Sequence, residues 1–189
     1  MFEVELKAKV SSIEELYEYL VKELGFSAVE YVAEDYYFDH PCRDFEKSDE
    51  ELRVRLEKKG AGSRVVLTYK GAVIIKDRSA REEIEASVTS DIIRILNKLG
   101  FSTRAFKRKT GWFIEGDDIE IVLCSVRGVY GNKALCLGDY IEVELRVDSR
   151  EKVSEARKKV QEFLEKLPGI IEIDTEYYME KMKKLAEID

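Results

Sequence analysis

The chain is poor in the residues on which several protein classes depend. Its 189 residues include two prolines, one histidine (His40) and three cysteines, with no CxxC spacing among them. An odd number of scattered cysteines argues against a disulfide framework, so we expect a reducing, cytoplasmic environment. A single histidine leaves little room for a His-rich metal site or a Ser-His-Asp mechanism.

Long apolar runs and a net positive charge are also missing. No stretch approaches the roughly 18 apolar residues of a transmembrane helix, and Met1 leads directly into alternating Glu and Lys, unlike a secretory leader. The net charge is −7. Because nucleic acids and anionic membranes attract basic surfaces, we expect neither of them as a partner.

Charge of both signs is abundant instead. The chain carries 32 Lys and Arg against 39 Asp and Glu, and 44% of its residues are hydrophobic. At this length, that composition predicts one compact domain over residues 1–189. One explanation of the charge is the solvated, ion-pair-rich surface of a thermostable protein. The sequence leaves both a monomer and a homodimer open.

Apolar periodicity predicts more strands than helices. Alternating or β-branched and aromatic stretches predict strands over 2–10, 28–39, 51–58, 63–71, 79–88, 101–115, 117–126 and 138–147. Helical spacing predicts helices over 11–25, 90–99 and 149–167, and a short strand followed by a helix over 170–188. We expect a turn near Gly111 and a glycine-containing loop over 127–138. The order of these strands and helices along the chain predicts an α+β fold with a mostly antiparallel sheet.

The charged faces of these strands carry pairs of like charge two residues apart. The pairs are Glu3/Glu5, Arg53/Arg55, Glu83/Glu85, Lys107/Lys109 and Glu142/Glu144. In an ordinary half-buried sheet these faces would simply point to solvent. The amphipathic helices, however, need the apolar strand faces, which leaves the charged faces available to line a site.

Clusters of both signs suit a polyanion and its cations. Lys and Arg bind phosphate oxygens, and carboxylates hold hard cations such as Mg²⁺ or Mn²⁺. The chain has no P-loop motif and no GxGxxG before a helix. Side chains would therefore have to hold the phosphates of a nucleotide or polyphosphate, because these backbone cradles are absent.

Seven segments, in order, resemble motifs of the CYTH superfamily, the triphosphate tunnel metalloenzymes. These segments are Glu3-Val4-Glu5-Leu6-Lys7 (ExExK), Asp35-Tyr36-Tyr37-Phe38-Asp39 (YFD), Leu52-Arg53-Val54-Arg55 (LRxR), Leu67-Thr68-Tyr69-Lys70-Gly71 (LTxKG), Arg81-Glu82-Glu83-Ile84-Glu85 (RxExE), Lys107-Arg108-Lys109 (KxR) and Gly138-Asp139-Tyr140-Ile141-Glu142-Val143-Glu144 (GxFxExE). Residues 35–55 most resemble the class IV adenylate cyclase branch.

The resemblance implies a closed eight-stranded antiparallel β-barrel, or tunnel, with helices packed on its outside. It implies an enzyme that uses Mg²⁺ or Mn²⁺, in this branch a class IV adenylate cyclase-like lyase that converts ATP to cyclic AMP and pyrophosphate. A triphosphatase acting on inorganic triphosphate, thiamine triphosphate or nucleoside triphosphates is the alternative. A non-catalytic nucleotide- or polyphosphate-binding protein is the second alternative.

The resemblance also assigns roles by position. Phosphate binding falls to Lys7, Arg53, Arg55, Lys70, Arg81, Lys107 and Lys109. Metal binding falls to Glu3, Glu5, Glu83, Glu85, Glu142 and Glu144. Catalysis falls to Lys7, Arg55 and Glu83. One departure supports the non-catalytic alternative, because Cys124 stands where the family commonly has a metal-binding aspartate; Glu120, on the same strand face, is a candidate replacement.

Overall fold

The computed structural model describes residues 2–71, 82–116 and 119–187, so Arg81 lies outside the described residues. The strands are β1 Phe2–Val10, β2 Ala28–Asp39, β3 Glu51–Lys59, β4 Gly62–Lys70, β5 Glu83–Ser87, β6 Ser102–Glu115, β7 Ile119–Tyr130, β8 Lys133–Val147 and β9 Ile170–Asp174. The helices are α1 Ile13–Lys22, α2 Asp91–Lys98, α3 Val153–Lys166 and α4 Tyr178–Glu187, with a 3₁₀ turn, η1, over Arg150–Lys152. The α+β expectation is confirmed.

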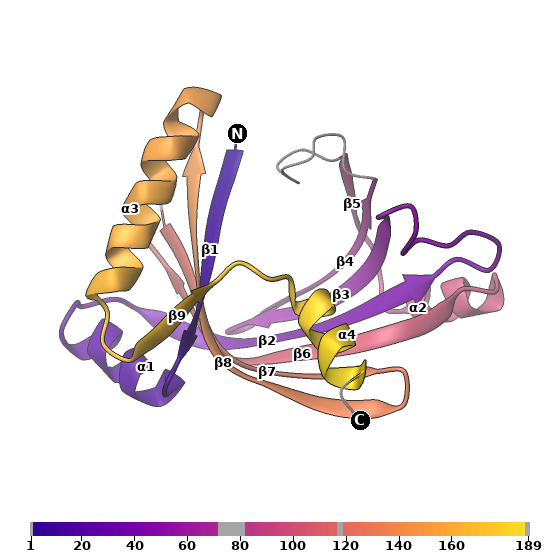
Figure 1. Ribbon diagram of the computed structural model, residues 1–189, viewed down its shortest axis with the longest axis horizontal. Coiled ribbons are helices and arrows are strands. Elements are labelled where there is room, and N and C mark those ends of the chain that lie inside the picture. Colours follow the sequence, from indigo (N-terminus) through magenta and orange to yellow (C-terminus); the bar gives the residue numbers. More distant parts are fainter. Residues whose placement is uncertain (1, 72–81, 117–118, 188–189) are drawn as a thin grey trace.

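All the strands belong to one antiparallel sheet in the order β5-β4-β3-β2-β6-β7-β8-β1-β9. The family resemblance predicts eight strands in a closed barrel. In the described part of the chain the strands number nine, and β5 and β9 are the two ends of the order. Figure 1 shows a sheet bent into a trough, with β1 and β8 on one side and β4 and β5 on the other. Strand twist gives a large antiparallel sheet this curvature.

Apolar packing fixes which face of the sheet is convex. Leu6 and Ile121 pack with Leu20 of α1 and Leu164 of α3, and all are buried. Leu96 of α2 packs on the far side, against β2 and β3. Each such side chain contributes roughly 1.5–3 kcal/mol when buried. These three helices cover the outside of the trough, as predicted (Figure 1).

The fourth helix does not follow that prediction. Tyr178 and Met182 of α4 pack against Val126 and Tyr140, which lie on the inner face of the sheet. Gly128 permits this contact, because a Cβ there would lie 2.7 Å from the Met182 Cε. Helix α4 therefore covers part of the trough's inside (Figure 1).

Two local predictions are wrong for the same reason: a glycine was taken to mark the end of a strand. The structure has no turn at Gly111, since β6 runs unbroken through it. A Cβ there would lie 2.0 Å from the Leu123 carbonyl oxygen, so this glycine allows close approach of β7. The expected loop over 127–138 is instead an extension of β7 and β8, whose pairing continues to Tyr130 and Lys133.

Candidate functional site

The inner face of the trough lines a cavity of about 720 Å³. Its wall contains most of the residues predicted to bind phosphate or metal, so these charged strand faces line a cavity, as the sequence predicted. Those lining residues are Glu5, Arg53, Arg55, Lys70, Glu83, Glu85, Lys107, Lys109, Glu142 and Glu144. Because charged residues alternate with apolar ones along the strands, positively and negatively charged side chains face the same cavity.

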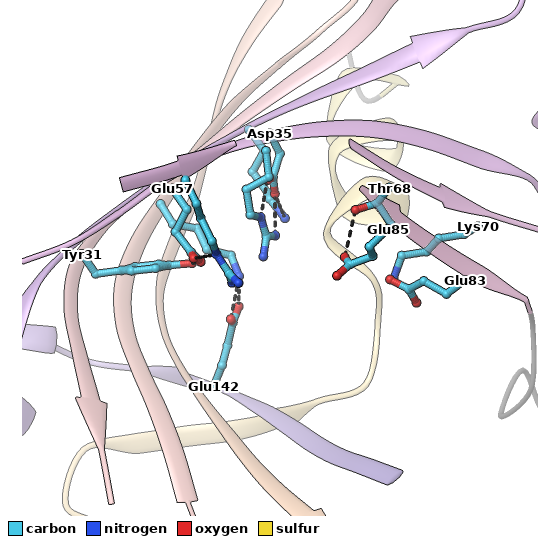
Figure 2. A network of polar contacts seen from close by, with 12 residues as sticks. Tyr31, Asp35, Glu57, Thr68, Lys70, Glu83, Glu85 and Glu142 are labelled. Atoms are coloured by element: carbon cyan, nitrogen blue, oxygen red, sulfur yellow. Dashed lines mark hydrogen bonds and ion pairs between the residues drawn. The ribbon is translucent and has the colours of Figure 1, made fainter. Parts of the chain in front are cut away.

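At the centre of the site, the fully buried Asp35 joins two of the lining cations, one from each strand beside β2. It lies directly opposite Arg55 of β3 and Lys107 of β6. Its carboxylate accepts from Arg55 Nε at 2.6 Å and Nη2 at 2.9 Å, and it lies 3.0 Å from Lys107 Nζ. Burial opposes ionisation, but Lys107 and Arg55 outweigh it and hold the pKa of Asp35 well below its usual range. Figure 2 shows Asp35 within this group.

The neighbouring lysine on β6 has a carboxylate of its own. Lys109 Nζ lies 2.6 Å from both carboxylate oxygens of Glu142, and both side chains are buried. Burial opposes the charge on each, yet the attraction between them raises the pKa of Lys109 and lowers that of Glu142. Lys107 behaves differently, because burial lowers its pKa to about 8 in spite of Asp35.

Unlike Arg55, Lys107 and Lys109, Arg53 forms no ion pair with a carboxylate in the part of the chain that the structure describes. Among the described residues its Nε is buried without a hydrogen-bond partner. A buried donor without a partner is costly unless a ligand or water satisfies it. Burial and Arg55 oppose its charge, while Asp35 helps to keep the pKa of Arg53 raised. Arg53 is therefore placed to receive an anion.

The β4–β5 end of the cavity holds a separate group. Lys70 Nζ lies 3.1 Å from Glu83, and the Thr68 hydroxyl donates to Glu85 at 3.0 Å. Figure 2 shows these residues across the cavity from Glu142. The Glu83 side chain is 41% exposed at this end, and its ion-pair partner there is Lys70.

Lys7, the third predicted catalytic residue, is held by the C-terminal segment. Its ammonium lies 2.9 Å from the Asp174 carboxylate and donates to the carbonyls of Asp174 at 3.2 Å and Glu176 at 2.6 Å. Burial lowers its pKa in spite of Asp174. No sequence signal pointed to this pairing, because the β1–β9 register is needed to place residue 174 opposite residue 7.

Sequence reasoning also missed Tyr178. The centre of its ring lies 4.9 Å from the Lys7 ammonium, 4.6 Å from that of Lys107 and 5.1 Å from that of Lys109. A ring face at this distance attracts a cation. Three cations predicted to bind phosphate thus surround one aromatic side chain of α4. The apolar spacing of the last helix gave no sign of which sheet face it would cover.

The departure at Cys124 is visible in the structure. Cys124 is fully buried, and burial raises the pKa of its thiol, so the uncharged form dominates at neutral pH. Glu120 lines the cavity, where it lies 2.7 Å from Arg146 and 3.9 Å from Lys59. Its role as a replacement metal ligand stays a prediction.

The carboxylates suit a metal that the substrate helps to hold. No three His, Cys, Asp or Glu side chains within the described ranges converge into a cluster that could bind a metal by itself. Mg²⁺ is commonly bound by one or two carboxylates together with substrate phosphates. Glu5 and Glu142 fit that mode, because burial and then the charge of Glu142 raise the pKa of Glu5, as expected for neighbouring carboxylates. The Glu3 side chain is not described.

Comparison with known proteins places the chain among similar sequences and structures. The CYTH domain model matches residues 1–178. A Methanocaldococcus jannaschii protein named "Putative adenylate cyclase" is 33% identical over 173 residues, covering 90% of each chain. The PH1819 protein from Pyrococcus horikoshii OT3 is 30% identical with a TM-score of 0.75, and the match covers 97% of this chain and 99% of that one.

A more distant structure comes from a plant. The Hippeastrum protein described as a "Putative adenylyl cyclase" with "a dominant triphophatase activity" has a TM-score of 0.59 at 15% identity, covering 96% of this chain and 94% of that one. At that identity the likeness concerns the fold. Across the described ranges, the structure contains no helix of the length and apolar character that would cross a membrane.

Proposed function

The chain belongs to the CYTH family, and from this premise we propose that residues 1–189 form a single CYTH domain that acts on the triphosphate of a small molecule bound in the cavity. The reaction proposed is that of a class IV adenylate cyclase, which converts ATP to cyclic AMP and pyrophosphate. The related protein from Methanocaldococcus jannaschii, with its cyclase name, supports this choice. A cytoplasmic location, and a monomeric or homodimeric state, stay predictions.

The observation that carries the proposal is the central concentration of positive charge. Arg53, Arg55, Lys107 and Lys109 all line the cavity. Within the described residues, the direct carboxylate partners of this group are Asp35 and Glu142. The group therefore keeps an excess of positive charge, and a polyphosphate would supply the counter-charge through charge-assisted hydrogen bonds.

The cyclase reaction needs charge stabilisation more than covalent chemistry from the protein. The ribose 3′-oxygen forms a bond to the α-phosphorus and gives up its proton to solvent water, while the bond from that phosphorus to the oxygen bridging to the β-phosphorus breaks and pyrophosphate leaves. Arg53, Arg55 and Lys107 would bind the phosphate oxygens and stabilise the charge that develops on the leaving pyrophosphate. A Mg²⁺ or Mn²⁺ ion held by Glu5 and Glu142 would supply further charge neutralisation.

A triphosphatase is the second candidate, and the same cations would serve it. In that reaction water attacks the γ-phosphorus, the bond from that phosphorus to the β–γ bridging oxygen breaks, and the products are orthophosphate and the diphosphate remainder of the substrate. The activity named for the Hippeastrum protein, which shares the fold, is the observation that favours this candidate. The buried thiol of Cys124 favours the third possibility, a nucleotide or polyphosphate binder without turnover.

The products separate these functions. The purified protein is incubated with ATP, inorganic triphosphate or thiamine triphosphate, in the presence of Mg²⁺ or Mn²⁺. We expect cyclic AMP and pyrophosphate from ATP. Orthophosphate without cyclic AMP would replace the cyclase proposal by the triphosphatase, and binding without any product would replace both by a binding protein. Absence of both product and binding would contradict the whole proposal.

A further inference from the structure

Asp35 is not among the residues predicted to bind phosphate or metal, yet Arg55 and Lys107 both contact it. We propose that Asp35 is a positioning residue, which fixes the Arg55 guanidinium and the Lys107 ammonium in the orientation that receives the triphosphate. This inference rests on the proposed function, since it concerns how the same cavity binds and turns over its substrate.

The register of the sheet gives Asp35 this position. Strand β2 lies between β3 and β6, and Asp35 pairs directly with Arg55 on one side and Lys107 on the other. Its carboxylate is fully buried, so water does not compete for either contact. The three residues therefore form one row across three adjacent strands, with the two cations lining the cavity. Figure 2 shows the position of Asp35 in this polar network.

Asp35 binds one edge of the Arg55 guanidinium and leaves its other edge available for a ligand. Asp35 accepts from Nε and Nη2, while Nη1 has no hydrogen-bond partner among the described residues. A two-point contact of this kind fixes the plane of the guanidinium as well as its position. Arg53, two residues earlier, has no such anchor. Arg55 is thus oriented before the ligand binds, whereas Arg53 is not.

The contact with Lys107 adds an electrostatic effect. Burial lowers the pKa of Lys107 to about 8, and Asp35 is the strongest of the groups that oppose this shift. The groups that act on or contact this ammonium are Asp35 of β2, Arg55 of β3, Lys109 of β6, Glu142 of β8, and the rings of Tyr37 and Tyr178. Without the carboxylate, Lys107 would lose its proton at lower pH.

Three variants test the proposal. Asp35→Asn keeps the shape of the side chain and removes its charge. Asp35→Glu keeps the charge, so it is expected to fold, but displaces the carboxylate by one methylene. Asp39→Asn is the matched control on the same strand, because Asp39 contacts Arg104 at 3.4 Å and is 41% exposed. Circular dichroism checks that each variant is folded before kinetics are measured.

We expect kcat to fall about 100-fold in Asp35→Asn, the order of loss that a small misplacement of a substrate-binding group can cause. KM for ATP should not rise, because the cavity has become more positive. Asp35→Glu should also lose kcat, and Asp39→Asn should match the wild type. If Asp35→Asn does not fold, the Asp35→Glu result decides. Unchanged kcat in a folded Asp35→Asn or Asp35→Glu protein would overturn the proposal.

A second measurement does not depend on turnover. The pKa of Lys107 is followed by NMR of the lysine ε-carbons, with Lys107→Gln to assign the signal. Asp35→Asn should titrate at lower pH than the wild type, whereas Asp35→Glu should stay near it. An unshifted titration in Asp35→Asn would show that Asp35 does not hold the ammonium. Failure of the wild type to bind or convert a triphosphate would contradict the proposed function alone, since this titration would still report on Asp35.

Discussion

The centre of the cavity and its β4–β5 end are built from the same types of residue, yet they differ in burial. At the centre, Asp35 is fully buried between Arg55 and Lys107. At the β4–β5 end, Lys70 pairs with Glu83, whose side chain is 41% exposed. Because water replaces a lost partner only where it can reach, the same kind of ion pair should be costly to break at the centre and cheap at the end.

The largest effect should follow from breaking the central pair. Arg55→Gln leaves a buried carboxylate with Lys107 as its remaining partner. Removal of one member of a buried ion pair typically costs about 3–5 kcal/mol. We expect a loss of that order in the free energy of unfolding, measured by urea denaturation. A loss below about 1 kcal/mol, the ordinary range for exposed pairs, would show that the centre is as well solvated as the end.

Lys70→Gln is the control at the β4–β5 end. It also breaks an ion pair within the cavity, but its partner Glu83 can be solvated. We expect a change of about 1 kcal/mol or less in the same denaturation experiment. A loss as large as that of Arg55→Gln would remove the distinction between the two regions.

A smaller effect concerns pH. Because burial lowers the pKa of Lys107 to about 8, its charge is present below that pH and lost above it. Triphosphate affinity should therefore fall as pH rises through about 8, and binding near this pH should take up a proton. Calorimetry in buffers of different ionisation enthalpy measures this uptake. Any proton taken up by the triphosphate itself is the same for the wild type and Lys107→Gln, so the variant should show less total proton uptake. Equal uptake in the two proteins would assign the proton to a group other than Lys107.

The lowered pKa of Lys107 makes stability change with pH in the direction opposite to triphosphate affinity. Since the folded pKa of Lys107 lies below its ordinary value of 10.5, the unfolded chain binds more protons between about pH 8 and 10.5. The contribution of this group to the free energy of unfolding therefore rises with pH across that window. Asp35 acts in the same direction at acidic pH, because its lowered pKa gives stability above the unfolded value that is lost as pH falls through the folded one.

Much of this arrangement could be predicted from the sequence, because alternation along a strand decides which face each side chain occupies. The strands carrying Arg53 and Lys107 were predicted, and both residues line the cavity. Whether an ion pair is buried depends on neighbouring strands, so the role of Asp35 needed the register. The contact of Lys7 with Asp174 needed the pairing of β9, which lies far along the chain.

Helix α4 shows the limit of periodicity most clearly. An apolar stripe predicts that a helix packs on something apolar, but both faces of this sheet offer such surface. Met182 packs on the inner face beside Val126, and Gly128 makes room for it. Nothing in the helical spacing distinguishes that choice from the outer face that α3 covers.

Calorimetric titration of inorganic triphosphate into the wild type, Arg53→Gln and Arg108→Gln tests the central claim, that the buried cations of the inner face bind the triphosphate. Arg108 is the matched control, because it lies between Lys107 and Lys109 but is 51% exposed and pairs with Glu34. Arg53→Gln should lose about tenfold or more in affinity, since a charged hydrogen bond contributes about 1.5–3 kcal/mol. Arg108→Gln should bind like the wild type. Equal losses in the two variants, or none in Arg53→Gln, would contradict the account.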